Sequence, residues 1–218
     1  MDIQGQLIQD IAVFKPEMAT TKVLDFFAKN TFSHLAVIEE ELLLGMLSEN
    51  DIDTYKEHKT IADCSFVFEH FFVKSDANWL DVLEVFSVNE ANVVPVVNEN
   101  MHVIGYYNLA DIVHQFIATP FFTEPGDIVV VAKGIKDYSF SEIAQIVESN
   151  NAKIIGGFVT DLRSDVVEVT VKISKANLND ILQSFRRYNY TILLGSKDDQ
   201  FLEELKSRSD YLSKYLNV

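Results

Sequence analysis

Cysteine is almost absent from this sequence, since Cys64 is the only one among 218 residues. A single cysteine can form neither an intrachain disulfide nor a multi-cysteine metal site, which fits a reducing compartment and an ordinary buried thiol. No apolar run reaches the roughly 18 residues that a transmembrane helix needs. The N-terminal residues lack the basic patch and apolar stretch of a secretory signal. We therefore expect a cytoplasmic protein without a membrane partner.

Basic residues are also few compared with acidic ones. Lys and Arg together number 18 against 33 Asp and Glu, which gives a net charge of −15. This is the wrong sign for a general nucleic-acid surface, so we expect no nucleic-acid partner. Proline (4) and glycine (8) are scarce and 48% of the residues are hydrophobic, so the composition allows a substantial core rather than disorder. The length suits one large or two small domains.

Catalytic and metal-binding motifs are missing as well. The five histidines are scattered, and none stands in a His-Glu-x-x-His spacing. The sequence contains neither the phosphate-binding pattern Gly-x-x-x-x-Gly-Lys nor the dinucleotide pattern Gly-x-Gly-x-x-Gly. We therefore predict a protein that is not an enzyme and that holds no metal.

The sequence does contain an internal repeat. Residues 45–52 read Gly-Met-Leu-Ser-Glu-Asn-Asp-Ile, and residues 105–112 read Gly-Tyr-Tyr-Asn-Leu-Ala-Asp-Ile. Upstream of these endings, apolar residues of the two copies match at an offset of 59, as Phe27 does with Phe86. One unit has therefore been duplicated.

Each copy has the pattern helix, strand, strand, helix. Apolar residues at helical spacing precede two short buried strands, and each second strand leads into a helix at a Ser-x-x-Asp or Asn-x-x-Asp sequence. The expected strands are residues 34–38 and 42–47 in the first copy, and 93–97 and 103–107 in the second. Pro95 has no backbone N–H, so we expect its strand to be an edge strand or to end there.

After residue 117 the pattern changes. Residues 118–126 contain two prolines and a glycine, which is typical of a linker. Residues 127–195 then predict strand, helix, strand, strand, helix and strand, the split β-α-β order of ferredoxin-like domains. The first of these helices follows Ser139-x-x-Glu142, which fits a capping box.

The chain is therefore predicted to be an α+β protein in five segments. They are a first repeat (1–60), a second repeat (61–117), a linker (118–126), a ferredoxin-like domain (127–195) and a C-terminal amphipathic helix (196–218). On the last segment Phe201, Leu205, Leu212 and Leu216 fall on one side of a helix. We expect that helix to pack on the protein or on a partner subunit.

The repeat resembles the CBS domain, named after cystathionine β-synthase, and the two copies resemble the paired module in which such domains usually occur. The resemblance covers about residues 3–117. Its most specific element is an ending of Gly, two residues, Thr or Ser, two residues, Asp and an aliphatic residue. Gly45, Ser48 and Asp51 match this ending, whereas the second copy has Asn108 at the hydroxyl position.

This resemblance implies an adenine nucleotide ligand, such as AMP, ADP, ATP or S-adenosylmethionine. The Ser48 hydroxyl would lie near phosphate, and the Asp51 carboxylate would accept hydrogen bonds from ribose hydroxyls, since a carboxylate is a pure acceptor. Asn108 and Asp111 would form a second site. The same residues also fit helix N-caps that need no ligand, so both interpretations stay open.

Six further residues complete the predicted nucleotide-binding set. Four strand residues would flank the base, as the corresponding family strands do, and two lysines at equivalent repeat positions would supply positive charge to phosphate. They are His34, Leu35, Asn92 and Val94 on the strands, and the cations Lys15 and Lys74. Ordinary core packing and solvated loop lysines are the alternatives.

Residues 127–195 resemble the ACT domain by their order of elements. ACT domains that bind amino acids usually have a glycine in the first strand-to-helix turn, and residues 136–140 contain none, which favours a dimerisation role. The complete order resembles bacterial acetoin-utilisation accessory proteins and implies a homodimer. We expect a non-catalytic regulatory sensor; the alternative is a ligand-free dimerisation or interaction scaffold.

Overall fold

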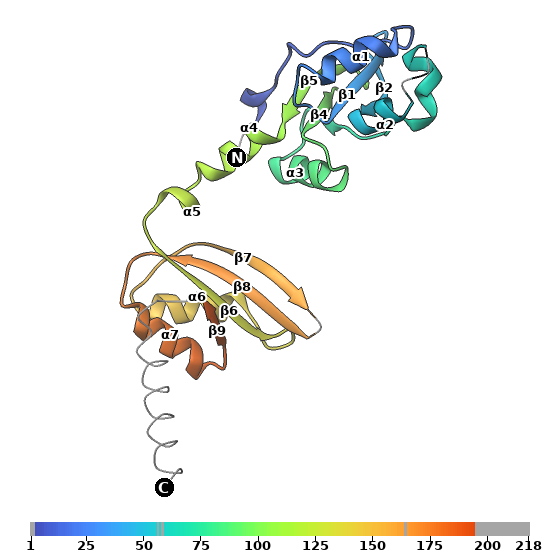
Figure 1. The fold of residues 1–218 in the computed structure, drawn as a ribbon. Coiled ribbons are helices and arrows are strands. Elements are labelled where there is room, and N and C mark those ends of the chain that lie inside the picture. The colour runs from blue at the N-terminus through green and yellow to red at the C-terminus, as the bar shows by residue number, and fades with distance from the viewer. Residues whose placement is uncertain (1–2, 56, 58, 164, 195–218) are drawn as a thin grey trace. The chain divides into compact units, whose positions relative to one another are not determined.

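The structure of the chain is a computed structural model that describes residues 3–55, 57, 59–163 and 165–194 (Figure 1). It is a mixed α and β protein that divides into two compact units, Met1–Ala118 and Thr119–Val218. Each unit is described by itself below. The amphipathic helix predicted over residues 196–218 lies outside the described residues.

The first repeat of the N-terminal unit has two antiparallel strands flanked by helices. Its elements are η1 (Gln4–Gln6), α1 (Thr20–Phe27), β1 (His34–Glu39), β2 (Leu42–Ser48) and α2 (Glu49–Thr54). The register pairs His34 with Ser48, so the start of β1 lies beside the end of β2. The order helix, strand, strand, helix agrees with the sequence pattern.

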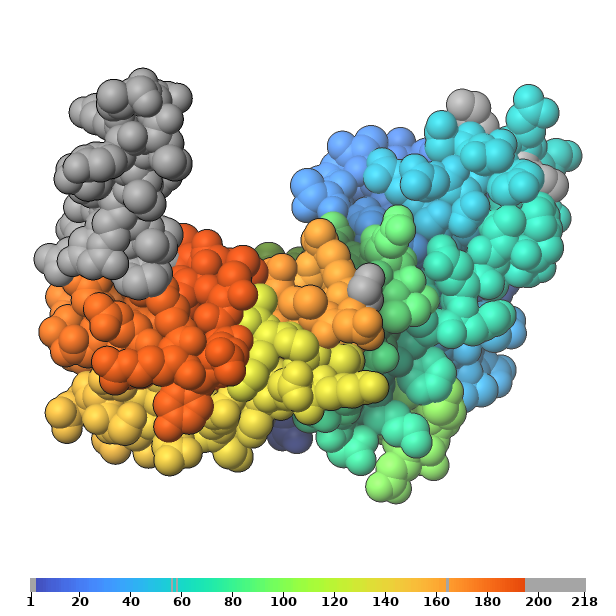
Figure 2. Space-filling view, turned by 90° about the horizontal axis from the view of Figure 1, so that it is seen from below, coloured from blue at the N-terminus to red at the C-terminus, as the bar shows by residue number. Residues whose placement is uncertain are grey.

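The second repeat follows the same plan with one additional short strand. Its elements are η2 (Ile61–Val67), β3 (Val73–Lys74), α3 (Trp79–Val88), β4 (Val93–Val97), β5 (Val103–Asn108) and α4 (Leu109–Ile117). Figure 2 shows the teal residues of η2 beside the cyan end of the first repeat, where the rings of Tyr55 and Phe66 meet edge to face at 5.1 Å.

The prediction for Pro95 is wrong. Pro95 lies in the middle of β4, and β4 is the central strand of the sheet β3-β4-β5. Pro95 is tolerated there because β3 is only two residues long and pairs with Val96 and Val97. No neighbouring strand therefore needs an N–H from Pro95 on that side, although Pro95 still pairs with Tyr106 of β5 on the other.

Each repeat contributes its N-terminal segment to the other repeat. The segment of the first repeat pairs with the second through a bridge from Ile8 to Tyr106, and the segment of the second pairs with the first through a bridge from Glu69 to Met46. The two bridges occupy equivalent positions of the duplicated unit. The pair is therefore held together by a reciprocal exchange of segments.

This exchange explains the glycine of each repeat ending. A Cβ on Gly45 would lie 2.8 Å from the Cβ of Phe68 and 3.2 Å from the carbonyl oxygen of Glu69. A Cβ on Gly105 would lie 2.8 Å from the carbonyl oxygen of Ile8. Because the segment of the other repeat crosses directly over each glycine, a side chain at either position would push it away.

The two repeats also meet at equivalent residues. The Asn92 backbone N–H donates to the Ser33 hydroxyl at 2.9 Å, and the Ser33 backbone N–H donates to the Asn92 side-chain oxygen at 2.8 Å. The apolar core beneath them contains Met46 of β2 together with Val94 and Tyr106 of the second repeat. The interior of the pair is thus shared rather than split into two cores.

The C-terminal unit is a four-stranded antiparallel sheet in the order β7-β8-β6-β9. Its elements are α5 (Pro120–Thr123), β6 (Asp127–Gly134), α6 (Phe140–Ser149), β7 (Ile154–Arg163), β8 (Val166–Ile173), α7 (Leu178–Arg187) and β9 (Thr191–Leu194). Both longer helices lie on the same side of the sheet (Figure 1). Their buried side chains, such as Ile143 and Phe185, pack on Val131 and Val169 of the strands.

The capping box predicted at α6 is absent. Ser139 is the N-cap residue but makes no side-chain cap hydrogen bond, and Glu142 instead accepts a hydrogen bond from the Lys133 ammonium group at 2.6 Å. Lys133 is 13% exposed and its ammonium group lies 4.4 Å from the centre of the Tyr190 ring. This largely buried cation needs a carboxylate partner, and Glu142 supplies it.

Candidate functional site

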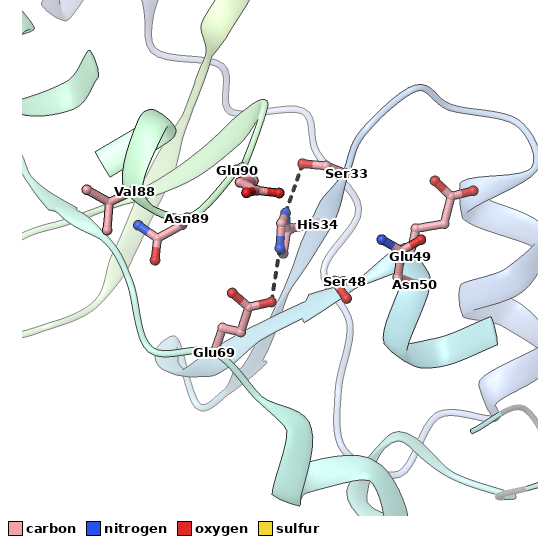
Figure 3. A pocket seen from close by; sticks show the side chains of 9 residues that line it. All are labelled: Ser33, His34, Ser48, Glu49, Asn50, Glu69, Val88, Asn89 and Glu90. Atoms are coloured by element: carbon pink, nitrogen blue, oxygen red, sulfur yellow. Dashed lines mark hydrogen bonds and ion pairs between the residues drawn. The ribbon is translucent and has the colours of Figure 1, made fainter. Parts of the chain in front are cut away.

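A cavity of about 390 Å³ lies between the two repeats (Figure 3). Four pieces of chain form its lining: the start of β1, the junction of β2 with α2, the segment that follows η2, and the end of α3. The lining residues are Ser33, His34, Ser48, Glu49, Asn50, Glu69, Val88, Asn89 and Glu90. Both repeats therefore contribute to one site.

Ser48 is the N-cap residue of α2 at this cavity. Its hydroxyl accepts a hydrogen bond from the Asp51 backbone N–H at 3.1 Å and donates one to the Asp51 carboxylate at 2.7 Å. Ser48 is 9% exposed, and Asp51 is half-buried beside it. The structure therefore shows the capping role predicted for this pair. Ser48 lines the cavity, whereas Asp51 is not among the lining residues and is joined to the cavity through Ser48.

His34 connects the repeats at the back of the cavity. Its Nδ1 lies 2.8 Å from the Ser33 hydroxyl, and its Nε2 lies 3.1 Å from a carboxylate oxygen of Glu69. The ring is 6% exposed and stands edge-on to Phe71 at 5.3 Å. Ser33 also hydrogen-bonds Asn92 of the second repeat. The hydrogen-bond network therefore joins Ser33 and His34 of the first repeat to two residues of the second, Glu69 and Asn92.

The lining of the cavity is acidic. In Figure 3 the side chains of Glu69 and Glu90 lie on the two sides of the His34 ring, whereas Glu49 projects away from them. Neither Lys nor Arg is among the described residues that line this cavity.

Lys15 and Lys74 are both exposed and lie at the other end of the first strands. Lys74 pairs with Val97, the last residue of β4, whereas Asn108 pairs with Val93, the first. Four strand residues span about 13 Å. The structure therefore does not bring the lysine of a repeat together with its Ser-x-x-Asp or Asn-x-x-Asp ending.

Three other predicted residues lie in the interior or between the repeats. Leu35 and Val94 are 2% and 0% exposed and belong to the apolar cores. The Asn92 side chain donates to the carbonyl oxygen of Thr31 at 2.6 Å and accepts from Ser33. Asn92 therefore joins the repeats and contacts the cavity only through Ser33.

Asn108 and Asp111 occupy the equivalent position in the second repeat. The Asn108 side-chain oxygen accepts from the Ala110 backbone N–H at 2.8 Å and caps α4, and Asp111 is half-buried in the first turn. A separate cavity of about 450 Å³ lies in this repeat, lined by Gln4, Leu7, Ser75, Asp76, Val96, Ile104 and Tyr107. It contains neither member of the pair.

Sequence reasoning missed Glu69, Asn89 and Glu90. They belong to the second repeat and reach the first only through the exchanged segment and the end of α3. Comparing the sequences of the two copies could not have identified these residues, because their position at the cavity depends on how the repeats pack on each other. In the part of the chain that the structure describes, no group of three or more His, Cys, Asp or Glu side chains is arranged to hold a metal ion.

The family comparison identifies the class of the N-terminal unit. Residues 3–57 and 67–118 match the CBS domain model. This part of the chain is therefore a tandem pair of CBS domains, as the internal repeat and its endings indicated. Within the described residues, no helix combines the length and the apolar character needed to cross a membrane.

Three solved structures illustrate what this chain is similar to. A CBS domain pair/ACT domain protein from Thermotoga maritima is 19% identical with a TM-score of 0.48, covering 54% of this chain and 97% of that one. CBSX2, solved in complex with AMP, is 19% identical with a TM-score of 0.47, covering 53% and 95%. The cytosolic domain of the Mg²⁺ channel MgtE, solved in complex with ATP, is 20% identical with a TM-score of 0.44, covering 51% of this chain and 47% of that one.

Proposed function

We propose that this protein is a non-catalytic regulatory sensor that binds an adenosine-based ligand in the cavity between its CBS domains. The observation that carries the proposal is that Ser48 lines a cavity built by both repeats and holds the Asp51 carboxylate through a hydrogen bond of 2.7 Å. A ligand in such a place contacts both repeats at once, so it can favour one arrangement of the pair over another. The AMP and ATP complexes among the similar structures support the same class of ligand.

At this cavity we assign ribose recognition to Asp51, whose carboxylate is bonded to the lining residue Ser48. A carboxylate offers only acceptors, which suits the two neighbouring hydroxyl groups of ribose. The Ser48 hydroxyl already holds one Asp51 oxygen at 2.7 Å and so fixes the direction of the other. His34 and its partner Glu69 would border the base. We propose Asn108 and Asp111 as a second and separate ligand position.

For the rest of the chain we propose an ACT-like domain in the C-terminal unit, a homodimer and a cytoplasmic location. The four-stranded antiparallel sheet with two helices on one side supports the ACT-like interpretation. In this proposal residues 118–126 connect the sensor to a domain that transmits or dimerises. The resemblance to acetoin-utilisation accessory proteins belongs to the same proposal.

A thermal-shift panel tests the proposed function. The full chain is heated with adenosine, AMP, ADP, ATP and S-adenosylmethionine at millimolar concentration. A ligand at about 100 times its dissociation constant should add about 2.7 kcal/mol to the free energy of unfolding, which raises the melting temperature by several degrees. Asp51→Ala should lose this response, whereas Asp53→Ala, an exposed neighbour on the same helix, should keep it.

A ligand-free scaffold is the competing function, because both capping motifs are satisfied without a ligand. Sedimentation equilibrium separates the two functions. An intact dimer with no thermal response to any member of the panel would favour the scaffold. A response that disappears in Asp51→Ala while the oligomeric state is unchanged would favour the sensor.

A further inference from the structure

Three glutamates are among the side chains that line the cavity between the repeats. Glu69 and Glu90 lie on both sides of His34, and Glu49 stands at the border. Even a protonated His34 would leave more negative than positive charge in this lining, which contains no Lys or Arg among the described residues. A phosphate placed here would meet like charge, which solvent screens only in part because Glu69 is half-buried while Glu49 and Glu90 are exposed.

The helix at the cavity offers no compensation. Helix α2 is a short helix of six residues that already has Glu49 and Asp51 in its first turn. The Ser48 hydroxyl, which would otherwise donate to a phosphate oxygen, donates to the Asp51 carboxylate. Both features that could attract a phosphate are therefore already occupied by carboxylates of this chain.

The same lining suits a ligand that carries hydrogen-bond donors or positive charge. Adenosine presents ribose hydroxyls and an exocyclic amino group, all of them donors, and carboxylates are acceptors only. A sulfonium or ammonium group attached to adenosine would be attracted by Glu69 and Glu90. The cavity volume of about 390 Å³ falls in the range of small-molecule sites.

We infer that this cavity selects an adenosine derivative without a phosphate group, either a neutral nucleoside or thioether or an adenosyl sulfonium, over AMP, ADP and ATP. The inference rests on the proposed function, because it concerns the ligand chemistry of the same cavity.

Calorimetric titration of the full chain tests this selectivity. The ligands are adenosine, 5′-methylthioadenosine and S-adenosylmethionine on one side, and AMP and ATP on the other, the latter with and without Mg²⁺. We expect at least one phosphate-free ligand to bind about tenfold or more tightly than AMP and ATP, which corresponds to about 1.4 kcal/mol. Only heat that disappears in Asp51→Asn is assigned to this cavity, which separates it from binding at Asn108 and Asp111.

A charge-neutral variant supplies the second measurement. Glu90→Gln keeps the size of the side chain and removes one negative charge from the lining, so AMP should gain affinity by a factor of about 3 or more while adenosine changes little. Glu84→Gln is the matched control, because Glu84 is exposed on α3 and does not line the cavity. Higher salt should reduce the difference between the wild-type affinities for adenosine and for AMP, because it screens the repulsion between phosphate and the carboxylates.

The outcomes are distinct. Binding of AMP or ATP at this cavity that is as tight as that of every phosphate-free ligand would overturn the inference and leave the proposed function intact. An unchanged AMP-to-adenosine ratio in Glu90→Gln would also overturn it. No Asp51-dependent binding of any of these ligands would overturn the proposed function itself.

Discussion

The hydroxyl of Ser48 is engaged by its own helix before any ligand arrives. It accepts a hydrogen bond from the Asp51 N–H and donates one to the Asp51 carboxylate, so one hydroxyl at the cavity caps α2 and orients that carboxylate. At the residue scale, the cap and the proposed recognition of ribose therefore use one arrangement rather than two competing ones. A ligand that approached Asp51 would meet a carboxylate held in a fixed direction, which reduces the entropy lost on binding.

Replacing Ser48 tests the capping part of this arrangement. Ser48→Ala removes the acceptor for the Asp51 N–H and should lower the free energy of unfolding by about 1 kcal/mol. Ser48→Thr retains the hydroxyl and should recover most of the loss. Thr54→Ala is the control on the same helix, because the exposed Thr54 hydroxyl donates to the carbonyl oxygen of Asn50 within the helix and caps no helix end. Urea denaturation gives all three values, and equal losses in Ser48→Ala and Thr54→Ala would contradict the prediction.

The repeat glycines make the second residue-scale prediction. Gly45→Ala places a methyl group 2.8 Å from the Cβ of Phe68, an atom that cannot rotate away, and should destabilise the protein by about 1–3 kcal/mol. Gly5→Ala should change stability far less, because nothing lies within 4 Å of its added Cβ. Thermal unfolding of both variants provides the comparison. A Gly45→Ala variant as stable as Gly5→Ala would show that the exchanged segment can move aside.

At the scale of single elements, the contact between β6 and α6 sets an acid sensitivity in the C-terminal unit. The hydrogen bond from Lys133 holds the pKa of Glu142 below its ordinary value of 4.5. Burial, and then the hydrogen bond to Glu142, raise the pKa of Tyr190 in the same network to about 12. The side chains of Lys133, Glu142 and Tyr190 thus join β6, α6 and the residue that precedes β9.

The sign of the acid effect follows from the lowered pKa of Glu142. The ionised carboxylate stabilises the folded unit above about pH 4.5, and this stabilisation is lost as the pH falls through the depressed folded-state pKa. Wild type should therefore be more stable than Glu142→Gln at pH 7, and this difference in the free energy of unfolding should shrink as the pH is lowered below about 4.5 in chemical denaturation. Glu148→Gln, whose partner Lys153 is largely exposed at 3.7 Å, should differ little from wild type at pH 7.

The elements also show what sequence patterns can and cannot predict. Periodicity and turn residues predicted the helix, strand, strand, helix order of each repeat, because these signals are local. Pro95 was misplaced because the length of its neighbour β3, which decides whether the missing N–H matters, is a tertiary property. Glu142 was misassigned for the same reason, since its partner Lys133 belongs to another element.

The same limit applies to the candidate site. Ser48, Asp51 and His34 follow from the motif and its strand, but Glu69 and Glu90 reach the cavity only through the packing of one repeat on the other. The motif alone therefore could not predict the charge of the cavity lining, on which the proposed ligand selectivity depends.

At the scale of the whole molecule, the single thiol reports the opening of the CBS pair. Cys64 is fully buried in the core of the first repeat, and burial followed by the nearby Asp63 raises its thiol pKa. The native protein should therefore react with a disulfide reagent only when it opens. A ligand at about 100 times its dissociation constant should slow labelling about 100-fold when opening is at rapid equilibrium.

The control for this measurement is the reaction of glutathione with the same reagent, which the ligand must leave unchanged. Full-rate labelling of the native protein at pH 8 would contradict the buried position of Cys64. Slow labelling that no adenosine derivative slows further would count against ligand binding between the repeats.

The exchange of N-terminal segments has a consequence for how the chain is made. Ile8 finds its partner only when Tyr106 has left the ribosome, which at about 5–20 residues per second means a wait of roughly 5–20 s. During that time the segment around Ile8 has no β5 to pair with and stays uncovered by the second repeat. The exchange also reverses the usual expectation for a local change: loss of the bridge at Ile8 should destabilise the second repeat, whose strand β5 it contacts, more than the repeat to which Ile8 belongs in the sequence.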